Sequence, residues 1–292
     1  MFELVQAGPQ SYYIDCPAKI GIYLRGGQDA YLIDSGGDKD AGRKIRRLLE
    51  QQGWTLKGIM NTHSNADHIG GNRYLQQQCG CRVFAGGIEA AFTEAPLLEP
   101  SFLYGGYPFK ELRHKFLMAA ASKTVPFSDE AFPREVEVIP LPGHFFEMAG
   151  FRTPDGTVYL ADCLSSAEVL KKYHLSFIYD VEAYLQTLAK VEKMQAGLFV
   201  PSHAEAAEDI GPLVRLNRDK VLEIAGFLLD ACAEPRGAEE LLQMVFSRYG
   251  MTMTCEQYVL IGSTVRSYLS WLKDKGQLQI IIDNNRLLWA VN

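Results

Sequence analysis

The sequence of 292 residues lacks a long uninterrupted run of apolar residues. A transmembrane helix needs about 20 such residues, so we expect no membrane-spanning segment. The opening residues also lack the basic stretch followed by an apolar core that marks a secretory signal, since they read MFELVQAGPQ. We therefore expect a soluble, cytoplasmic protein without a membrane partner.

Cysteine pairs with the C-x-x-C spacing of a structural zinc site are also lacking. The six cysteines are Cys16, Cys79, Cys81, Cys163, Cys232 and Cys255. Because thiols stay reduced in the cytoplasm, we expect free cysteines that pack as small apolar side chains.

The sequence also lacks an excess of positive charge. The formal net charge is −6 and the charges are spread along the chain, which predicts no electrostatic footprint for a polyanion such as nucleic acid. Residues 209–292 contain nine basic and ten acidic residues, so this part has no advantage in binding a phosphate backbone. A small molecule is the expected substrate.

What the amino-terminal part contains is an alternation of predicted strands and helices. Short apolar runs over residues 11–34 predict a β-meander, and a helical pattern follows over residues 40–52. A strand ending near residue 61, a helix over residues 67–78 and a strand over residues 81–86 come next. This order is typical of layered α/β folds.

Residues 86–134 interrupt that order with aromatic residues and repeated prolines. We interpret this stretch as an insertion over the scaffold. Its aromatic side chains either line a ligand pocket or pack the insertion onto the core, and the pattern favours neither.

Potential metal ligands follow predicted strands that are far apart in the sequence. His63 follows the strand near residue 61, and later strands are predicted to end at His144, Asp162 and His203. Residues at the ends of separate strands can converge at one edge of a sheet system. Imidazole and carboxylate are donors that zinc, iron and manganese accept, so this placement predicts a metal site.

From about residue 209 the pattern changes to three predicted helices and a terminal hairpin around Asp283. The helices are expected near residues 221–228, 238–249 and 256–275. This order resembles a winged-helix domain. We expect it to pack on the rest of the chain or to form a homodimer, and to cover the active site.

The stretch Thr62–Gly71, which reads THSNADHIGG, resembles the H-x-H-x-D-H signature of the metallo-β-lactamase fold superfamily. Further motifs in the same order extend the resemblance over residues 10–205: LIDSG at 32–36, GH at 143–144, LAD at 160–162 and PSH at 201–203. The likeness is to glyoxalase-II-like and lactamase-beta-like hydrolases. It implies an α/β fold, a four-layer αβ/βα sandwich, in residues 1–208 and a winged-helix-like C-terminal domain in residues 209–292.

The resemblance also implies a set of metal ligands. The first site would consist of His63, Asn65 and His144, the second of Asp67, His68 and His203, with Asp162 able to bridge them. Asp34 resembles the carboxylate that orients metal-bound imidazoles. One or two zinc ions are implied, with manganese or iron as alternatives.

Asn65 departs from the family pattern, because a histidine is expected at its position. A neutral amide oxygen holds a zinc-like metal less tightly than an imidazole does. Three outcomes stay open: a dinuclear site with a labile first metal, a mononuclear site on the four residues Asp67, His68, Asp162 and His203, and a degenerate site without turnover. A second departure is Phe145-Phe146-Glu147 after His144, whose rings are expected to narrow the site or make it more apolar.

The implied chemistry is hydrolysis of a small ester, thioester or lactone by a water molecule that the metal ionises to hydroxide. Asp67, which we favour, or Asp162 would transfer the proton, and Tyr173 and Tyr179 are candidates for stabilising an oxyanion. The alternatives are a nuclease, an iron-based redox enzyme and a non-catalytic metal-binding protein. His114 and His174 lie among basic residues, and we expect them on the surface.

Overall fold

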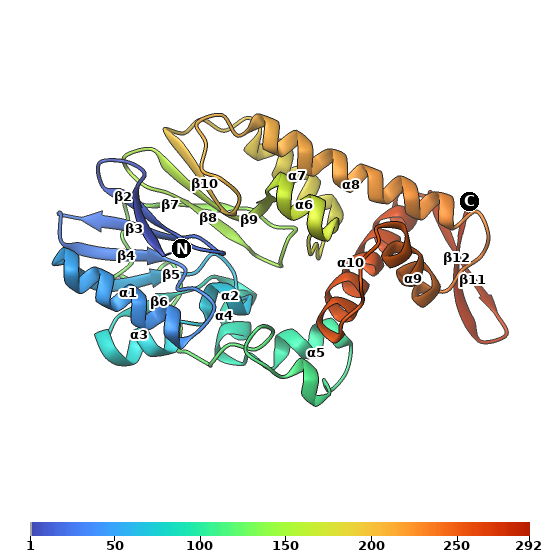
Figure 1. Ribbon diagram of the computed structural model, residues 1–292, viewed down its shortest axis with the longest axis horizontal. Coiled ribbons are helices and arrows are strands. Elements are labelled where there is room, and N and C mark those ends of the chain that lie inside the picture. The colour runs from blue at the N-terminus through green and yellow to red at the C-terminus, as the bar shows by residue number, and fades with distance from the viewer. Residues whose placement is uncertain (1) are drawn as a thin grey trace.

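The computed structural model describes residues 2–292, in which two β-sheets pack face to face (Figure 1). The first sheet contains β1 (Glu3–Gln6), β2 (Ser11–Asp15), β3 (Ile20–Arg25), β4 (Asp29–Ile33), β5 (Thr55–Met60) and β6 (Arg82–Phe84). These strands lie in chain order, antiparallel from β1 to β4 and parallel from β4 to β6. The predicted β-meander is confirmed.

The second sheet is formed later in the chain. It contains β7 (Glu137–Pro140), β8 (Ala149–Arg152), β9 (Thr157–Ser165) and β10 (Leu198–His203), in the order β10-β9-β8-β7. The edge strand β10 runs parallel to β9, and its register shifts around Pro201. Irregularities of this kind redirect side chains at a strand end.

Helices cover the outer face of each sheet (Figure 1). The first sheet packs against α1 (Lys39–Gln52) and α3 (Asn72–Cys79), and the second against α7 (Val181–Val191) and α8 (Gly211–Ala231). Ile45 and Leu75 show the pattern, since both are fully buried against the first sheet. The layers therefore run helix, sheet, sheet, helix, and the four-layer sandwich is confirmed.

The inner faces of the two sheets share one apolar layer. Tyr31 and Phe84 of the first sheet pack with Phe151 and Tyr159 of the second. The Tyr159 hydroxyl donates a 2.8 Å hydrogen bond to the carbonyl oxygen of Tyr12, so a buried polar group is satisfied across the interface. This layer fixes the ends of the strands of one sheet relative to those of the other.

The helix predicted over residues 67–78 is wrong, because the structure has α2 (Ala66–Ile69) and α3 separated by two glycines. A Cβ atom on Gly70 would lie 2.2 Å from the carbonyl carbon of Gly37, and one on Gly71 would lie 2.3 Å from the carbonyl oxygen of Ser35. The helical spacing of apolar residues does not reveal this close backbone approach, which only glycine permits.

Two predicted strand ends are also wrong. β7 ends at Pro140, so His144 lies in the loop that follows, and β9 continues past Asp162 to Ser165. The strand at β10 does end at His203 as predicted. Loop segments, as well as strand ends, therefore bring the ligands together.

The insertion at residues 86–134 is partly helical. It contains α4 (Gly87–Glu94), α5 (Leu98–Tyr104) and the 3-10 helix η1 (Lys110–Leu112). Leu103 and Leu112 pack with Val259 of α10 (Cys255–Asp274). The insertion therefore contacts the C-terminal helices as well as the sandwich.

The C-terminal residues form α8, α9 (Ala238–Arg248), α10, β11 (Leu278–Asp283) and β12 (Arg286–Val291), in the predicted order. Their apolar side chains continue the core of the second sheet, because Leu228 and Tyr268 belong to the same buried cluster as Leu164 and Leu188. The domain boundary at residue 208 and the winged-helix likeness stay predictions. Across residues 2–292, every helix is too short or too polar to traverse a bilayer.

The Gly70 turn provides a test of the fold around the ligands. We expect Gly70→Ala to lower the free energy of unfolding by about 1–3 kcal/mol, because the added methyl group overpacks against the Gly37 backbone. Urea denaturation followed by circular dichroism measures this change.

Gly226→Ala is the matched control. Gly226 lies in α8 with nothing within 4 Å of an added Cβ atom, so this substitution should stabilise the protein by about 0.5–1 kcal/mol. Equal unfolding free energies for Gly70→Ala and the unsubstituted protein would show that the close approach at Gly70 does not matter.

Candidate metal centre

Loops at one end of the sandwich bring the predicted ligands together. His63 follows β5, Asp67 and His68 lie in the short helix α2, and His144 lies in the loop between β7 and β8. Asp162 comes from β9 and His203 from the end of β10. Segments separated by more than a hundred residues therefore meet at this end.

The predicted second site is assembled around Asp162. Ligand atoms of Asp67, His68, Asp162 and His203 all lie within 4.8 Å of one another. The Nε2 atoms of His68 and His203 each lie 3.1 Å from an Asp162 carboxylate oxygen. Asp67 Oδ2 lies 3.5 Å from His203 Nε2 and 3.7 Å from His68 Nε2.

The predicted first site lies on the other side of the same carboxylate. Ligand atoms of His63, His144 and Asp162 also lie within 4.8 Å of one another. Asp162 Oδ2 is 3.7 Å from His144 Nε2 and 4.0 Å from His63 Nε2. Asp162 is common to both groups, which is the position required of a bridging carboxylate.

Each imidazole is fixed through its Nδ1 atom. His144 donates to the carbonyl oxygen of Phe177 at 2.9 Å, and His203 donates to that of Pro17 at 2.8 Å. Because a carbonyl only accepts, the proton is on Nδ1 and Nε2 faces the cluster. Anchoring of this kind sets the orientation of metal-bound histidines.

Asp34 anchors the other two imidazoles. It accepts a 2.8 Å hydrogen bond from His68 Nδ1, and two more from the backbone N–H and the hydroxyl of Thr62. The Thr62 oxygen lies 2.9 Å from His63 Nδ1, so it accepts the imidazole proton while its own proton points to Asp34. The orienting role expected of Asp34 agrees with these contacts.

Two residues beside the cluster, one after β4 and one within β9, have strained backbone. Asp34 has a φ of 65° and Ala161, next to Asp162, has a φ of 51°. Non-glycine residues in this left-handed region cost about 1–3 kcal/mol each, and such strain concentrates at functional sites.

Three buried atoms show that the cluster fits a cation. His63 Nε2, His68 Nε2 and Asp162 Oδ1 are buried and make no well-directed hydrogen bond, although the last two atoms lie 3.1 Å apart. Buried polar atoms without partners are rare and costly in native proteins. Because all three converge on one place and are nitrogen and oxygen donors, a divalent cation would satisfy them together.

Asn65 takes part in the first site through its amide oxygen. Its Nδ2 donates to the buried Glu99 carboxyl at 2.8 Å, which turns Oδ1 toward His144 Nε2 at 3.2 Å. With the His144 proton on Nδ1, two lone pairs face each other across this gap. A cation between them would convert this repulsion into coordination, so Asn65 is oriented as an oxygen donor.

The pKa values divide the histidines into two pairs. Burial opposes protonation of His203, but Asp162 and Asp67 outweigh it and raise its pKa to about 10. The same carboxylates and Asp34 raise the pKa of His68 against burial. Burial holds the pKa values of His63 and His144 below their usual range.

Sequence reasoning missed two buried carboxyl groups of the insertion, Glu89 and Glu99. Glu89 accepts hydrogen bonds from the backbone and the hydroxyl of Ser64 at 3.0 and 2.6 Å, so it holds the loop between His63 and Asn65. Burial raises the pKa of Glu89 to about 7. The sequence feature that could have indicated these two residues is an acidic side chain within an apolar, helix-forming stretch of the insertion.

The remaining candidates lie outside the cluster. His114 contacts Glu256 at 3.0 Å, and His174 stacks on Tyr249 with ring centroids 4.7 Å apart. All six cysteines are free, as expected. Tyr179 stacks on Phe146 with centroids 4.0 Å apart.

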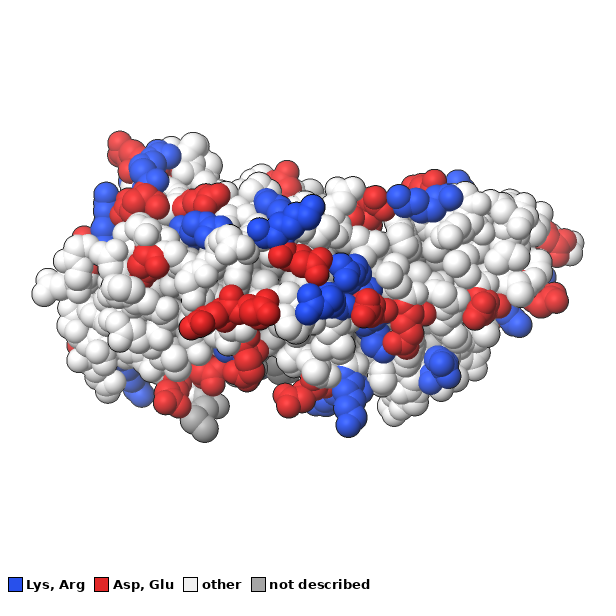
Figure 2. Space-filling model, turned by 90° about the horizontal axis from the view of Figure 1, so that it is seen from above, with Lys and Arg blue, Asp and Glu red and all other residues white. Residues whose placement is uncertain are grey.

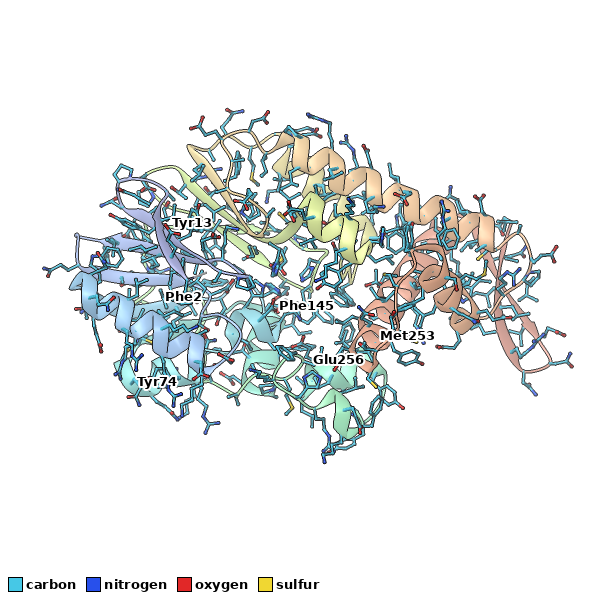
Figure 3. All side chains as sticks on the ribbon, viewed as in Figure 1. Phe2, Tyr13, Tyr74, Phe145, Met253 and Glu256 are labelled. Atoms are coloured by element: carbon cyan, nitrogen blue, oxygen red, sulfur yellow. The ribbon has the colours of Figure 1, made fainter. Side chains whose placement is uncertain are left out.

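The rings of Phe145 and Phe146 make the surroundings of the site more apolar, one of the two expected effects, since the ring centroid of Phe145 lies 6.2 Å from that of His63. They pack against Phe92 and Phe102 of the insertion, and Phe145 is fully buried. Figure 3 places Phe145 near the middle of the molecule, between the sheets and the C-terminal helices. Four insertion aromatics therefore pack into the protein, namely Phe92, Phe102, Phe127 and Phe132, whereas the other four are exposed and one of these, Phe116, lines a cavity.

Two cavities adjoin the cluster, and both include Pro17 and His203. The first, which we call the cleft, has a volume of about 730 Å³ and includes Asp67, Lys115 and Phe116. The second, the apolar cavity, has a volume of about 500 Å³ and includes Tyr173. Its apolar lining residues are Val169 of α6 (Ala167–Tyr173), Leu175, Phe177, Met251, Leu260 and Ile261.

Residues 21–203, more than half of the chain, match the family model of the Metallo-beta-lactamase superfamily. The chain belongs to the metallo-beta-lactamase superfamily. It is thus a hydrolase of a superfamily that typically binds metal ions, and the His/Asp cluster is its candidate metal site.

Similarity to individual proteins extends over most of this metallo-beta-lactamase chain. The Beta-lactamase-like protein 2 homolog of Drosophila melanogaster is 23% identical over 270 residues, which cover 88% of this chain and 83% of that protein. The crystal structure of a beta-lactamase domain protein from Burkholderia ambifaria gives a TM-score of 0.77 at 16% identity, covering 99% of this chain and 94% of that one. A family protein from Thermus thermophilus gives 0.71 at 16% identity, covering 100% and 97%. These structural likenesses show the fold alone.

A shorter segment is more similar to another group. The hydroxyacylglutathione hydrolase of Bradyrhizobium sp. is 54% identical over 39 residues, but these cover only 13% of this chain and 15% of that protein. The match is local and does not by itself show a shared activity.

Proton release tests whether the cluster binds metal. Metal binding requires neutral imidazole, and at about pH 8 His203 of the metal-free protein is protonated because its pKa is about 10. Zinc binding should therefore release protons and weaken as the pH falls. Titration calorimetry in buffers of different ionisation enthalpy measures the release, and a heat of binding independent of the buffer would contradict it.

Substitution of Asn65 tests the weak first site. We expect Asn65→His to retain more metal after dialysis, because an imidazole binds zinc more tightly than an amide oxygen and Glu99 is placed to accept its second N–H. Elemental analysis measures the metal content. Asn285→His, which adds an imidazole on the exposed terminal hairpin, is the control, and an unchanged metal count in Asn65→His would show that position 65 does not limit binding.

Proposed function

We propose that this protein hydrolyses acyl thioesters of small thiol carriers, using one or two zinc ions held by the His/Asp cluster. The observation that carries the proposal is the apolar cavity of about 500 Å³ directly beside that cluster, which includes His144, Asp162 and His203. An acyl group in this cavity would bring its carbonyl to the ligands. The local similarity to a hydroxyacylglutathione hydrolase, whose name describes a thioesterase, supports the choice.

The ligand set has a composition suited to zinc. Four imidazoles, the Asp67 carboxylate and one amide oxygen surround the Asp162 carboxylate, and zinc accepts nitrogen and oxygen donors of this kind. A bound zinc ion would supply a nucleophile from water near neutral pH and would polarise the carbonyl oxygen.

The two aspartates have different roles in the proposed reaction. The Asp67 side chain is half-exposed and borders the cleft, whereas the Asp162 side chain is 10% exposed and lies between the imidazoles. Asp67 therefore has access to both water and the leaving group. We assign it the transfer of the proton, and assign Asp162 the holding of the metal.

In this hydrolysis the oxygen of water bonds to the acyl carbon as the carbon–sulfur bond breaks. One proton of the water is released to solvent when the water ionises, and the other ends on the departing thiolate, carried by Asp67. The Tyr173 hydroxyl, at the apolar cavity, is the candidate to contact the carbonyl oxygen. Tyr179 lies among the residues of a separate depression and is not assigned this role.

A combined substrate screen and metal analysis tests the proposal. The zinc-loaded protein should hydrolyse acyl thioesters faster than phosphodiesters or β-lactams, and Asp162→Asn should lose metal and at least about a hundredfold in kcat/KM, because it removes the shared carboxylate. Asp219→Asn, at an exposed position of α8, is the control. Faster turnover of phosphodiesters, or full activity of metal-depleted Asp162→Asn, would contradict the proposal.

A further inference from the structure

A large basic hollow lies on the metallo-beta-lactamase fold beside the cleft. It has a volume of about 840 Å³ and is bordered by α1, α3 and the segment that follows η1. Its cationic lining residues are Lys39, Arg43, Arg46, Arg73, Arg113 and Lys115. Asp38 is the only acidic residue among the residues that line it, although the whole protein carries a net charge of −6.

Half of these cations lack an acidic partner. Within residues 2–292, no carboxylate lies within 4 Å of the charged groups of Lys39, Arg73 or Arg113. The other three form surface pairs whose side chains are about one third exposed or more: Arg43 with Asp40, Arg46 with Glu50 and Lys115 with Asp38. Exposed pairs are weak and exchange readily, so the hollow keeps a positive potential.

This arrangement contrasts with another face of the molecule. Figure 2 shows Lys and Arg interspersed with Asp and Glu on the face that is uppermost in Figure 1. A concave region lined by one sign of charge concentrates an oppositely charged ligand more effectively than a mixed surface does.

The hollow is continuous with the cleft that contains the reacting centre. Gly37, Asp38 and Lys115 line both spaces, and the cleft includes Asp67 and His203. A ligand anchored in the hollow can therefore extend over the Asp38–Lys115 junction to the cluster. Residues of α10 line the apolar cavity and none of them lines the hollow, although His114 at the edge of the hollow contacts Glu256 of α10.

One wall offers an aromatic surface. Tyr74 lines the hollow, and the guanidinium groups of Arg43 and Arg46 each lie 5.9 Å from its ring centroid. Figure 3 shows Tyr74 at the lower left, beside α1 and α3. Met118 and Ala119 complete an apolar part of the lining. A ligand with a planar ring and several anionic groups could contact both Tyr74 and the arginines.

We propose that the basic hollow binds the phosphorylated, nucleotide-like end of the thiol carrier, a substrate class that rests on the thioesterase function proposed above. Four of its six cations are arginines, whose planar forks bind phosphate oxygens through two hydrogen bonds. A volume of about 840 Å³ suits a ligand much larger than one carboxylate, since pockets of about 300–1,000 Å³ hold drug-sized molecules. The acyl group would then enter the apolar cavity on the opposite side of the cluster.

The test compares one acyl group on three carriers with the zinc-loaded full chain. The carriers are coenzyme A, which has phosphates, glutathione, which has carboxylates, and neutral N-acetylcysteamine. We expect the coenzyme A thioester to have the highest kcat/KM. In the double variant R73E/R113E its KM should rise about tenfold or more, because two unpaired cations are reversed.

Arg47→Glu is the matched control. Arg47 is exposed on α1 but does not line the hollow, so the KM for the coenzyme A thioester should stay unchanged. Circular dichroism checks that the double variant is folded, and Lys39→Ala, which removes one cation without reversing charge, gives a second, milder variant with a smaller rise in KM.

Calorimetric binding of coenzyme A, without turnover, separates the two proposals. Tight binding that weakens in the double variant supports the hollow even when no thioester is cleaved. Cleavage of all three thioesters with equal kcat/KM overturns the hollow and leaves the thioesterase. A preference for the glutathione thioester overturns the phosphate assignment, and an RNA oligonucleotide that binds more tightly than coenzyme A assigns the hollow to nucleic acid and also overturns it.

Discussion

The site depends on one buried carboxylate that four imidazoles approach. Asp162 has little access to water, and it faces His68 and His203, whose pKa values it raises, that of His203 to about 10. A buried charge without partners would cost several kcal/mol. The two sheets must therefore be held so that loops from both meet at this carboxylate, and the apolar layer between Tyr31 and Tyr159 provides that constraint.

Polar groups just outside the cluster hold its ligands in the orientation that the site needs. Asp34, the carbonyl of Phe177 and the carbonyl of Pro17 fix the imidazoles through Nδ1 and leave Nε2 directed inward. Glu99 does the same for Asn65 by binding its amide nitrogen. The departure from histidine at position 65 is thus accommodated by the insertion, because Glu99 orients the oxygen that replaces an imidazole nitrogen.

The segments outside the sandwich form walls of the cavities that adjoin the cluster. The insertion packs against α10 through Leu103 and Val259, and residues of α10 form a wall of the apolar cavity. On the other side, α1 and α3 line the basic hollow with arginines, and α1 also borders the cleft. An apolar space and a cationic space therefore flank the same metal site, as a thioester with an acyl group and a charged carrier would require.

The sequence by itself determined the layered α/β fold and the β-meander of the first sheet, because hydrophobic periodicity is a local property, and the resemblance carried by THSNADHIGG supplied the candidate ligand set. Its local patterns did not show that Gly70 divides a helix, that His144 lies beyond its strand or that Glu99 holds Asn65. The basic hollow could not be predicted from the sequence either, since Arg43, Arg73 and Arg113 are dispersed along a chain of net negative charge. Only the tertiary structure decided these features, because each arises from contacts between segments that sequence spacing does not relate.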